Sequence, residues 1–292
     1  MVDLKYVTST GLVEFDLHDF TQAKLLKADF HNVDWTPEVI EKQYGTVVNR
    51  FTKGPQKFEC TFRFKGDPAK RKEQIDTFIF CTEYDLANKT PGRLYWNNQY
   101  IDVYFISHDC YPVDSGMNWT ELKGTYYAPF PFWIEEVTYN INPQSPLYPE
   151  EGLPEDVKGY PTTRGLVYGY TYSYPYGVNS GTFIIDSAIG ADFRAVVHGA
   201  ISYFKMEVAG NNYQINHSLL YGEKLIVDSR DTLPLDKKCY IIRQNGDEEN
   251  VFDYRDPTSS IFKRLPGGQV IITCNQPYVM DITLFMERSA PI

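Results

Sequence analysis

The sequence predicts a mainly β protein with a single helix, and three observations support this. Tyrosine and phenylalanine are abundant, with 23 and 18 residues among 292, whereas alanine, methionine and leucine are sparse, and aromatic side chains favour pleated, half-buried surfaces. Short apolar runs alternate with turn residues along most of the chain. Only one segment repeats its apolar residues at helical spacing. The length suits two domains or one large β domain.

Residues 1–140 are predicted to form a first domain, a β-sandwich-like or barrel-like fold that contains the helix. Val7 to Phe15 and Lys57 to Phe64 are expected strands. In the second of these, apolar and polar residues alternate, as they do when one face of a strand is buried. Trp35 to Glu38 is expected to start a short helical turn before Gly45.

The helix is expected at about residues 68–84. Asp67 can cap its N-terminus, and Pro68 fits the first helical position. Its apolar stripe, which should cover a sheet, consists of Ile75, Phe78, Ile79 and Leu86. A hairpin should follow, with Asn97-Asn98 as its turn, because asparagine tolerates the positive φ that tight hairpin turns require.

A proline-rich linker is predicted at residues 141–161, where five prolines stand beside an acidic cluster. Prolines at this density exclude a central strand or a helix and favour extended spacing. Residues 162–292 then show short strands with regular turn punctuation, which is typical of a β-sandwich or barrel. The expected strands are Val167–Tyr174, Thr182–Asp186, Phe193–Ser202, Tyr203–Val208, Asn212–Asn216, Lys224–Val227, Lys238–Arg243, Gln269–Asn275 and Tyr278–Arg288.

Composition excludes several classes of function. The net charge of -10 gives no general attraction for phosphate backbones or anionic lipid, so we expect neither sequence-specific nucleic-acid binding nor membrane binding. The five cysteines form no CxxC pair, which predicts free thiols in a protein made in a reducing cytoplasm. The N-terminus has no signal-peptide pattern, and no apolar run reaches the roughly 18 residues of a membrane span.

The sequence contains none of the common motifs for metal, nucleotide or nucleophile chemistry. We therefore predict no catalytic, metal-binding or cofactor-binding residues. His108-Asp109-Cys110 is interpreted as the end of a strand that enters a turn, not as a ligand cluster. Carboxylates are plentiful, so a glycosidase pair stays open. However, Glu135-Glu136 and Glu248-Glu249 are adjacent residues, which on a strand would point to opposite faces.

One local pattern stands out, a run of tyrosines at every second position. On a regular strand the five side chains would share one face. A functional interpretation is a carbohydrate platform, on which sugars stack against the rings. Packing against another domain or subunit is the favoured interpretation, because tyrosine is enriched at interfaces generally. The residues of this interface or glycan strip are Tyr168, Tyr170, Tyr172, Tyr174 and Tyr176.

A series of short stretches, in order along nearly the whole chain, resembles one protein family. The upstream stretches are Pro91–Trp96, Tyr100–Asp102, Pro131–Trp133 and Tyr172–Tyr176. The downstream stretches are Gly210–Asn216, Gly222–Ser229, Asn250–Phe252, Ser260–Gly268 and Met286–Pro291. Together they resemble the distal tail proteins of long-tailed bacteriophages that infect Gram-positive bacteria.

This resemblance implies an N-terminal belt domain that closes a homohexameric ring and a C-terminal galectin-like β-sandwich on the outside. The ring would sit in the virion at the tail tip, with the tail tube protein above it and the tail-tip lysin or fibre base below. DNA would pass through its lumen without recognition of its sequence, and no cofactor is implied. Some members carry an inserted arm in the second domain that grips receptor-binding proteins. We find no such insertion, which leaves that partner open.

Two other functions remain as alternatives. The first is a glycan-binding β-sandwich module that uses the tyrosine strip, since a galectin-like fold does not by itself establish sugar binding. The second is a hydrolase of cell-wall sugar, for which no general acid can be singled out.

Overall fold

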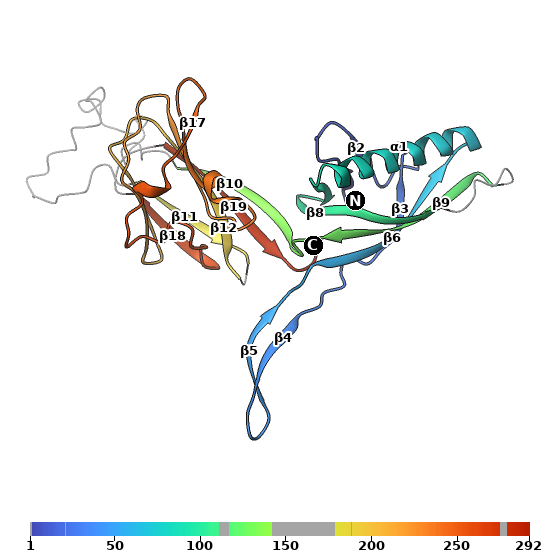
Figure 1. Cartoon of the computed structure of the whole chain (residues 1–292), viewed down its shortest axis with the longest axis horizontal. Helices are drawn as coiled ribbons and strands as arrows, with labels where there is room; N and C mark the ends of the chain where they lie inside the picture. The colour runs from blue at the N-terminus through green and yellow to red at the C-terminus, as the bar shows by residue number, and fades with distance from the viewer. Residues whose placement is uncertain (1, 21, 111–116, 142–178, 188, 275–278) are drawn as a thin grey trace, which may run out of the picture. The chain divides into compact units, whose positions relative to one another are not determined.

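The computed structural model describes residues 2–20, 22–110, 117–141, 179–187, 189–274 and 279–292 (Figure 1). The chain forms two compact units, Met1–Glu135 with Glu287–Ile292, and Glu136–Met286. The last six residues thus group with the first unit, whereas the sequence predicted them in the second domain. Their local hydrogen bonds explain this, because the Ile292 N–H donates to the side chain of Gln99 at 3.0 Å.

The first unit is built of antiparallel strands around one long central strand. That strand, β8 (Gln99–Cys110), pairs with β7 through its first half and with β9 through its second half. On one side the order is β10-β8-β7-β1-β2, and on the other β8-β9-β6-β3. The remaining bounds are β1 Leu4–Val7, β2 Glu14–Asp16, β3 Lys24–Ala28, β6 Gln56–Lys65, β7 Gly92–Trp96, β9 Trp119–Ala128 and β10 Trp133–Ile141.

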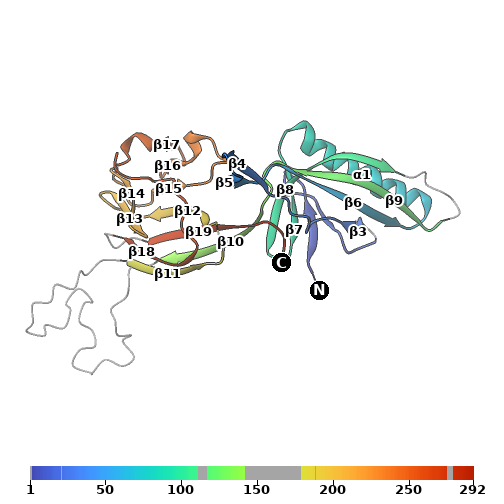
Figure 2. The same ribbon diagram turned by 90° about the horizontal axis from the view of Figure 1, so that it is seen from below.

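The expected helix is present as α1 (Pro68–Ala87). The Asp67 carboxylate accepts a hydrogen bond from the Lys70 N–H at 2.9 Å, so the predicted cap is confirmed. α1 lies over β8, β6 and β9 (Figures 1 and 2). It runs three residues beyond the predicted end. Leu86 does not join the buried stripe and is exposed, while the neighbouring Asp85 is buried.

The core of the first unit is aromatic. The Phe78 ring of α1 lies 5.1–5.4 Å from the rings of Phe15, Phe62 and Phe105. Asp85 is buried beside this cluster, where it accepts hydrogen bonds from the Tyr6 hydroxyl and the Ser9 hydroxyl, each at 2.6 Å. These contacts tie the first strand to the end of the helix.

Two sequence expectations for this unit were wrong. Val7 to Phe15 is not one strand but a hairpin, because Gly11 turns the chain with φ of +70° and lets Val7 pair with Glu14. Trp35 to Glu38 starts no helical turn. It leads into β4 (Thr36–Glu41), which pairs with β5 (Thr46–Thr52), since the β-branched residues of both segments favour extended backbone. The predicted Asn97 turn is confirmed, with φ of 55° at Asn97.

The second unit is a β-sandwich. One sheet has the order β17-β16-β15-β12-β19-β10 and the other β11-β18-β13-β14. Side chains from both sheets form its core, as in the contact of Phe193 with Tyr213, whose rings lie 5.3 Å apart. The strands are β11 Asn179–Ile185, β12 Ala191–His198, β13 Phe204–Val208, β14 Asn211–Ile215, β15 Lys224–Asp228, β16 Cys239–Ile242, β17 Glu248–Asn250, β18 Gly268–Cys274 and β19 Val279–Arg288, with two 3-10 turns, η1 Leu235–Lys237 and η2 Phe252–Tyr254.

The predicted mainly β class is confirmed. From residue 182 onward the predicted strands are present, with one correction. The strand expected at Phe193–Ser202 ends at His198, because Gly199 turns the chain with φ of +105°. The strand expected at Val167–Tyr174 lies outside the described residues, as does the predicted linker beyond Ile141. The five cysteines are not joined in disulfides, and among the described residues no helix is long and apolar enough to cross a bilayer.

Candidate self-assembly surface

The site predicted from the sequence was the tyrosine strip. Tyr168, Tyr170, Tyr172, Tyr174 and Tyr176 all lie outside the described residues. The strip they form therefore stays a prediction.

The carboxylates that the sequence left open are engaged in local contacts. Glu248 pairs with Lys237, and Glu249 pairs with Arg243. Glu135 accepts a hydrogen bond from Asn98 at 2.5 Å. His108, Asp109 and Cys110 end strand β8, as expected, and pair there with β9. Within the described ranges no group of three or more His, Cys, Asp or Glu side chains could hold a metal ion.

The most unusual feature of the first unit is the hairpin formed by β4 and β5, which we call the arm (residues 36–52). It projects from the body of the unit (Figure 1), and every one of its strand residues is exposed. Among the described strands it forms a two-stranded sheet of its own. An isolated two-stranded hairpin is marginally stable in water, so the arm lacks the packing that normally supports such an element.

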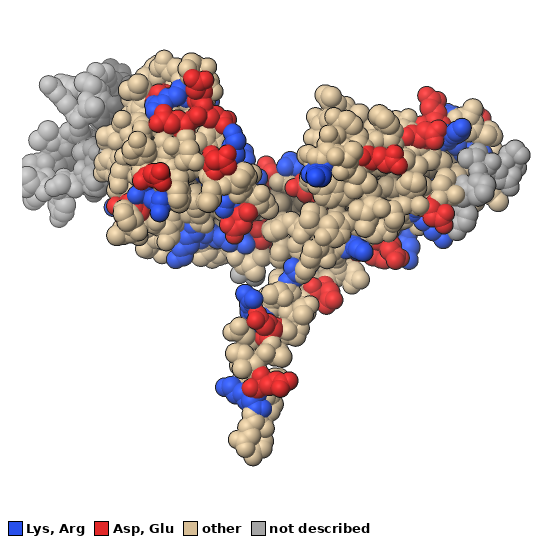
Figure 3. Space-filling view, in the orientation of Figure 1, with Lys and Arg blue, Asp and Glu red and all other residues tan. Residues whose placement is uncertain are grey.

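The arm exposes apolar side chains on both of its faces. Val39 pairs with Val48, and the next pair, Ile40 with Val47, points to the opposite face. These four residues, Phe51 and the tip residue Tyr44 are between 45 and 89% exposed. In Figure 3 charged side chains lie along the arm, and only its outermost end is tan in this view. Burying one such side chain fully against a partner stabilises by roughly 1.5–3 kcal/mol.

A β-bulge between Glu38 and Val39 shifts the register of the arm. On the side of the bulge nearer the base of the arm, Glu38 and Arg50 form an ion pair across the strands. The tip is closed by a hydrogen bond from the Lys42 N–H to the Gly45 carbonyl at 2.9 Å, and Gly45 has φ of +84°. A non-glycine residue would be strained at this angle. The hairpin is thus well specified although neither face is covered.

The base of the arm is fixed to the body of the first unit. The Lys53 ammonium donates to the Pro131 carbonyl at 2.6 Å and to the Ser289 carbonyl at 3.0 Å. It also lies 4.9 Å from the centre of the Phe132 ring. Burial lowers the pKa of Lys53 to about 8. Just before β4, the centre of the Trp35 ring lies 6.0 Å from the centre of the same Phe132 ring. The arm is therefore anchored at its base.

The arm offers two kinds of contact to another molecule. Its apolar faces can be buried, and the outer edges of β4 and β5 present unpaired backbone N–H and C=O groups that can accept another strand. Sequence reasoning missed this surface. The signal for it was present, since β-branched runs at Val39-Ile40 and Thr46-Val47-Val48 flank a short polar turn that ends in glycine.

The two units and the arm define a class of protein, a two-part β protein whose first part carries an uncovered hairpin. Neither protein-family models nor curated protein sequences give a match to the chain. Among solved structures, the chain is similar to SPP1 Dit (gp 19.1), which is described as a paradigm of the hub adsorption apparatus in phages that infect Gram-positive bacteria. The TM-score is 0.61 at 11% identity, over 99% of both chains.

Two further solved structures show the same similarity. Chains of the phage P2 baseplate in its activated conformation match with TM-scores of 0.62, with Ca, and 0.61, with Sr. Both are 11% identical and cover 99% of each chain. This chain thus has the fold of the phage Dit hub and baseplate proteins, and the resemblance found in the sequence is confirmed at the level of the fold.

Proposed function

We propose that this chain is a structural hub subunit of a bacteriophage tail tip, and that copies of it close a ring of six through the arm. The observation that carries the proposal is an anchored hairpin with apolar side chains on both faces and no cover within its own unit. The fold shared with a hub adsorption protein over 99% of both chains supports the tail-tip location.

A ring of identical subunits requires head-to-tail contacts, in which one surface of a copy meets a different surface of the next. An arm that projects from its own unit suits such a contact, because its apolar faces are not covered by that unit. In this proposal the first unit is the ring-forming belt domain, and the second is a galectin-like sandwich on the outside. The ring connects the tail tube to the tail-tip lysin or host-recognition apparatus in the virion.

The role proposed here is structural and not enzymatic. The acidic balance of the chain suits a channel that lets DNA pass without holding it, since like charges repel. Attachment of receptor-binding proteins is part of the same proposal.

The test is the solution mass of the purified chain across a range of concentrations, by light scattering coupled to size exclusion. We expect a species of six chains. The double variant Ile40→Ser/Val47→Ser, which removes one cross-strand apolar pair of the arm, should shift the mass to the monomer while circular dichroism stays unchanged. The matched control is Ile184→Ser/Ile271→Ser, which changes two exposed apolar residues of the second unit. A six-chain mass that survives the arm variant would contradict the role of the arm.

The alternative, a glycan-binding module, rests on the tyrosine strip. A glycan screen of the wild type and of Tyr170→Ala/Tyr172→Ala separates the two functions. Sugar affinity that falls in this variant, together with a monomeric wild type at all concentrations, would favour the lectin over the hub.

A further inference from the structure

The second unit displays two adjacent large apolar side chains on one turn. Leu220 is 62% exposed and Tyr221 is 83% exposed. Single exposed apolar residues are ordinary on protein surfaces. These two are neighbours in sequence, and the contacts around them hold the turn in one conformation.

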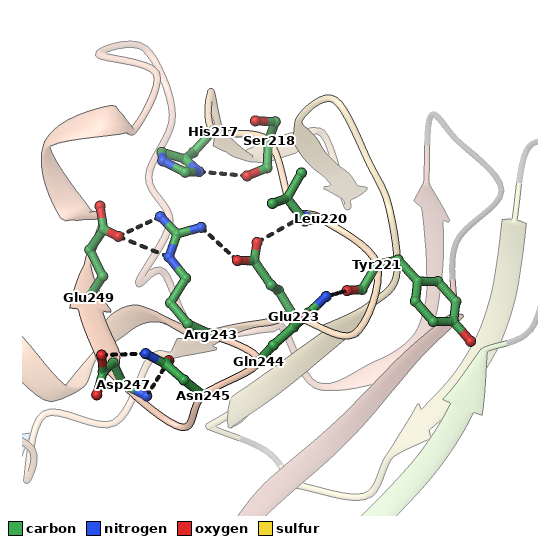
Figure 4. Close-up of polar contacts among 10 residues, drawn as sticks. All are labelled: His217, Ser218, Leu220, Tyr221, Glu223, Arg243, Gln244, Asn245, Asp247 and Glu249. Carbon is green, nitrogen blue, oxygen red and sulfur yellow. Dashed lines mark hydrogen bonds and ion pairs between the residues drawn. The ribbon is translucent and has the colours of Figure 1, made fainter.

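The turn is closed by two reciprocal hydrogen bonds. The Glu223 N–H donates to the Leu220 carbonyl at 3.1 Å, and the Leu220 N–H donates to the Glu223 carboxylate at 2.8 Å. Gly222 supplies the left-handed backbone with φ of +82°. From the neighbouring hairpin, the Gln244 side-chain amide donates to the Tyr221 carbonyl (Figure 4). Both turn carbonyls are therefore occupied.

An ion pair with a buried carboxylate supports the turn from beneath. The Glu223 side chain is only 4% exposed, and its second oxygen accepts from the Arg243 guanidinium at 2.9 Å. Arg243 is held in turn by Glu249, with Nε to Oε2 at 3.0 Å. The hydrogen bond from the Leu220 N–H and the Arg243 charge lower the pKa of Glu223. Figure 4 shows Tyr221 projecting away from this cluster, so the ion pair holds the backbone and leaves the ring free.

The surface next to the turn carries an excess of negative charge. Glu248 pairs with Lys237, Glu223 and Glu249 share Arg243, and Asp247 accepts a hydrogen bond from Asn245. One arginine thus serves two carboxylates, and four of these six charged side chains are acidic. Figure 3 shows acidic side chains gathered over the β17 region of this unit. A partner that covers the turn would gain from positive charge at this position.

We propose that the Leu220–Tyr221 turn docks a second protein, one that presents an apolar pocket bordered by Lys or Arg side chains. Tyrosine and rigid presentation are the features of interface anchors, because a preorganised turn loses little conformational freedom on binding. The partner's place in the same tail-tip assembly rests on the proposed function. The docking surface itself does not, since it lies wholly within the second unit.

Photo-crosslinking tests the identity of the occupant. Tyr221 is replaced by p-benzoylphenylalanine in the full chain, the assembled particle is irradiated, and the linked peptides are identified by mass spectrometry. We expect one different protein, linked through a segment in which Lys or Arg flanks an apolar residue. Links only to a second copy of this chain, only to glycan, to no molecule, or to a segment without basic residues would each overturn the proposal.

Affinity measurements with the cross-linked protein, purified, test the two parts of the surface. Leu220→Ser/Tyr221→Ser should weaken binding at least about tenfold, mainly through faster dissociation. Asp247→Asn/Glu248→Gln should slow association at low salt and lose most of this effect at high salt. Ile184→Ser/Ile271→Ser, at 69 and 59% exposure, is the matched control and should bind as the wild type does. Equal loss in the control would contradict the proposal.

Solution mass keeps this proposal apart from the hub proposal. The turn variants should retain the six-chain mass, because the turn lies outside the arm. A monomeric wild type that still cross-links as expected would remove the ring and leave the docking turn. A six-chain ring with no cross-linked protein would do the opposite.

Discussion

Two hairpins of this protein have opposite surroundings. The hairpin β13–β14 places Phe204, Met206 and Tyr213 in the core of the sandwich, and β13 also pairs with β18. The arm places none of its strand residues in a core. In β13 buried and less buried residues alternate, whereas the arm is apolar on both faces. An alternating pattern is satisfied within one chain, while a two-faced apolar hairpin requires cover from outside it.

The largest expected effect separates these hairpins by stability. Phe204→Ala removes a fully buried ring and should lower the free energy of unfolding of the second unit by about 3–5 kcal/mol. Phe51→Ala in the arm should change the unfolding free energy of the monomer by less than about 0.5 kcal/mol and instead weaken self-assembly. Urea unfolding and solution mass measure the two effects. Equal destabilisation by both variants would mean that the arm packs within its own chain.

Alkaline pH should destabilise the second unit, which contains the packed hairpin. Burial raises the pKa of Tyr213 to about 12 from 10.0, and that of the Cys239 thiol to about 12 from 9.0. The unfolded chain therefore ionises first, and the stability of the second unit should fall as the pH rises from about 9 to 12. Urea unfolding at stepped pH measures the slope, and Cys239→Ala should make it shallower. A stability that rises over this range would contradict the assignment.

A pair of glycines sharpens the contrast between the body of the first unit and the arm. A Cβ at Gly92 would lie 2.3 Å from the Tyr6 hydroxyl oxygen and 2.8 Å from the Asp85 carboxylate. Gly92→Ala should therefore destabilise the first unit by about 1–3 kcal/mol. Gly54, next to the base of the arm, has open space around it, and Gly54→Ala should be nearly neutral in thermal unfolding. A harmless Gly92→Ala would mean that Tyr6 and Asp85 can separate at little cost.

The smallest effect concerns the anchor of the arm. Lys53→Met leaves the Pro131 and Ser289 carbonyls without their donor and should cost about 1 kcal/mol at neutral pH. Because the pKa of Lys53 falls from 10.5 to about 8 on folding, the unfolded chain binds more protons between these values. The wild type should gain stability relative to the variant as the pH rises through this window. A constant difference between the two proteins would argue against the buried ammonium.

Much of the fold was predictable where a local residue pattern indicates one element and the face that it buries. The alternation of Phe58, Cys60, Phe62 and Phe64 predicted a strand with one buried face, and all four side chains are buried. Asp67 and Pro68 predicted the start of α1. A glycine explains one wrong prediction, because Gly11 splits the expected first strand into a hairpin.

The surfaces proposed for binding were less accessible to sequence reasoning. The turn at Leu220 and Tyr221 depends on Glu223, Arg243 and Gln244, which come together only when β15 and β16 pair. The arm gave a local signal, but its exposure follows from the absence of any packed neighbour within the first unit. A short segment reports its own conformational preference and not what covers it.

By itself, the sequence determined the mainly β class, the single helix with its cap, and the resemblance to phage distal tail proteins. These follow from local preferences and from residue order, which act without knowledge of distant neighbours. Only the tertiary structure decided that residues 36–52 form an uncovered arm, that Lys53 anchors it, and that the ion pair of Glu223 with Arg243 supports the turn of Tyr221. The reason is physical, because exposure, burial and ion pairing depend on segments far apart in the chain that meet only in the folded protein.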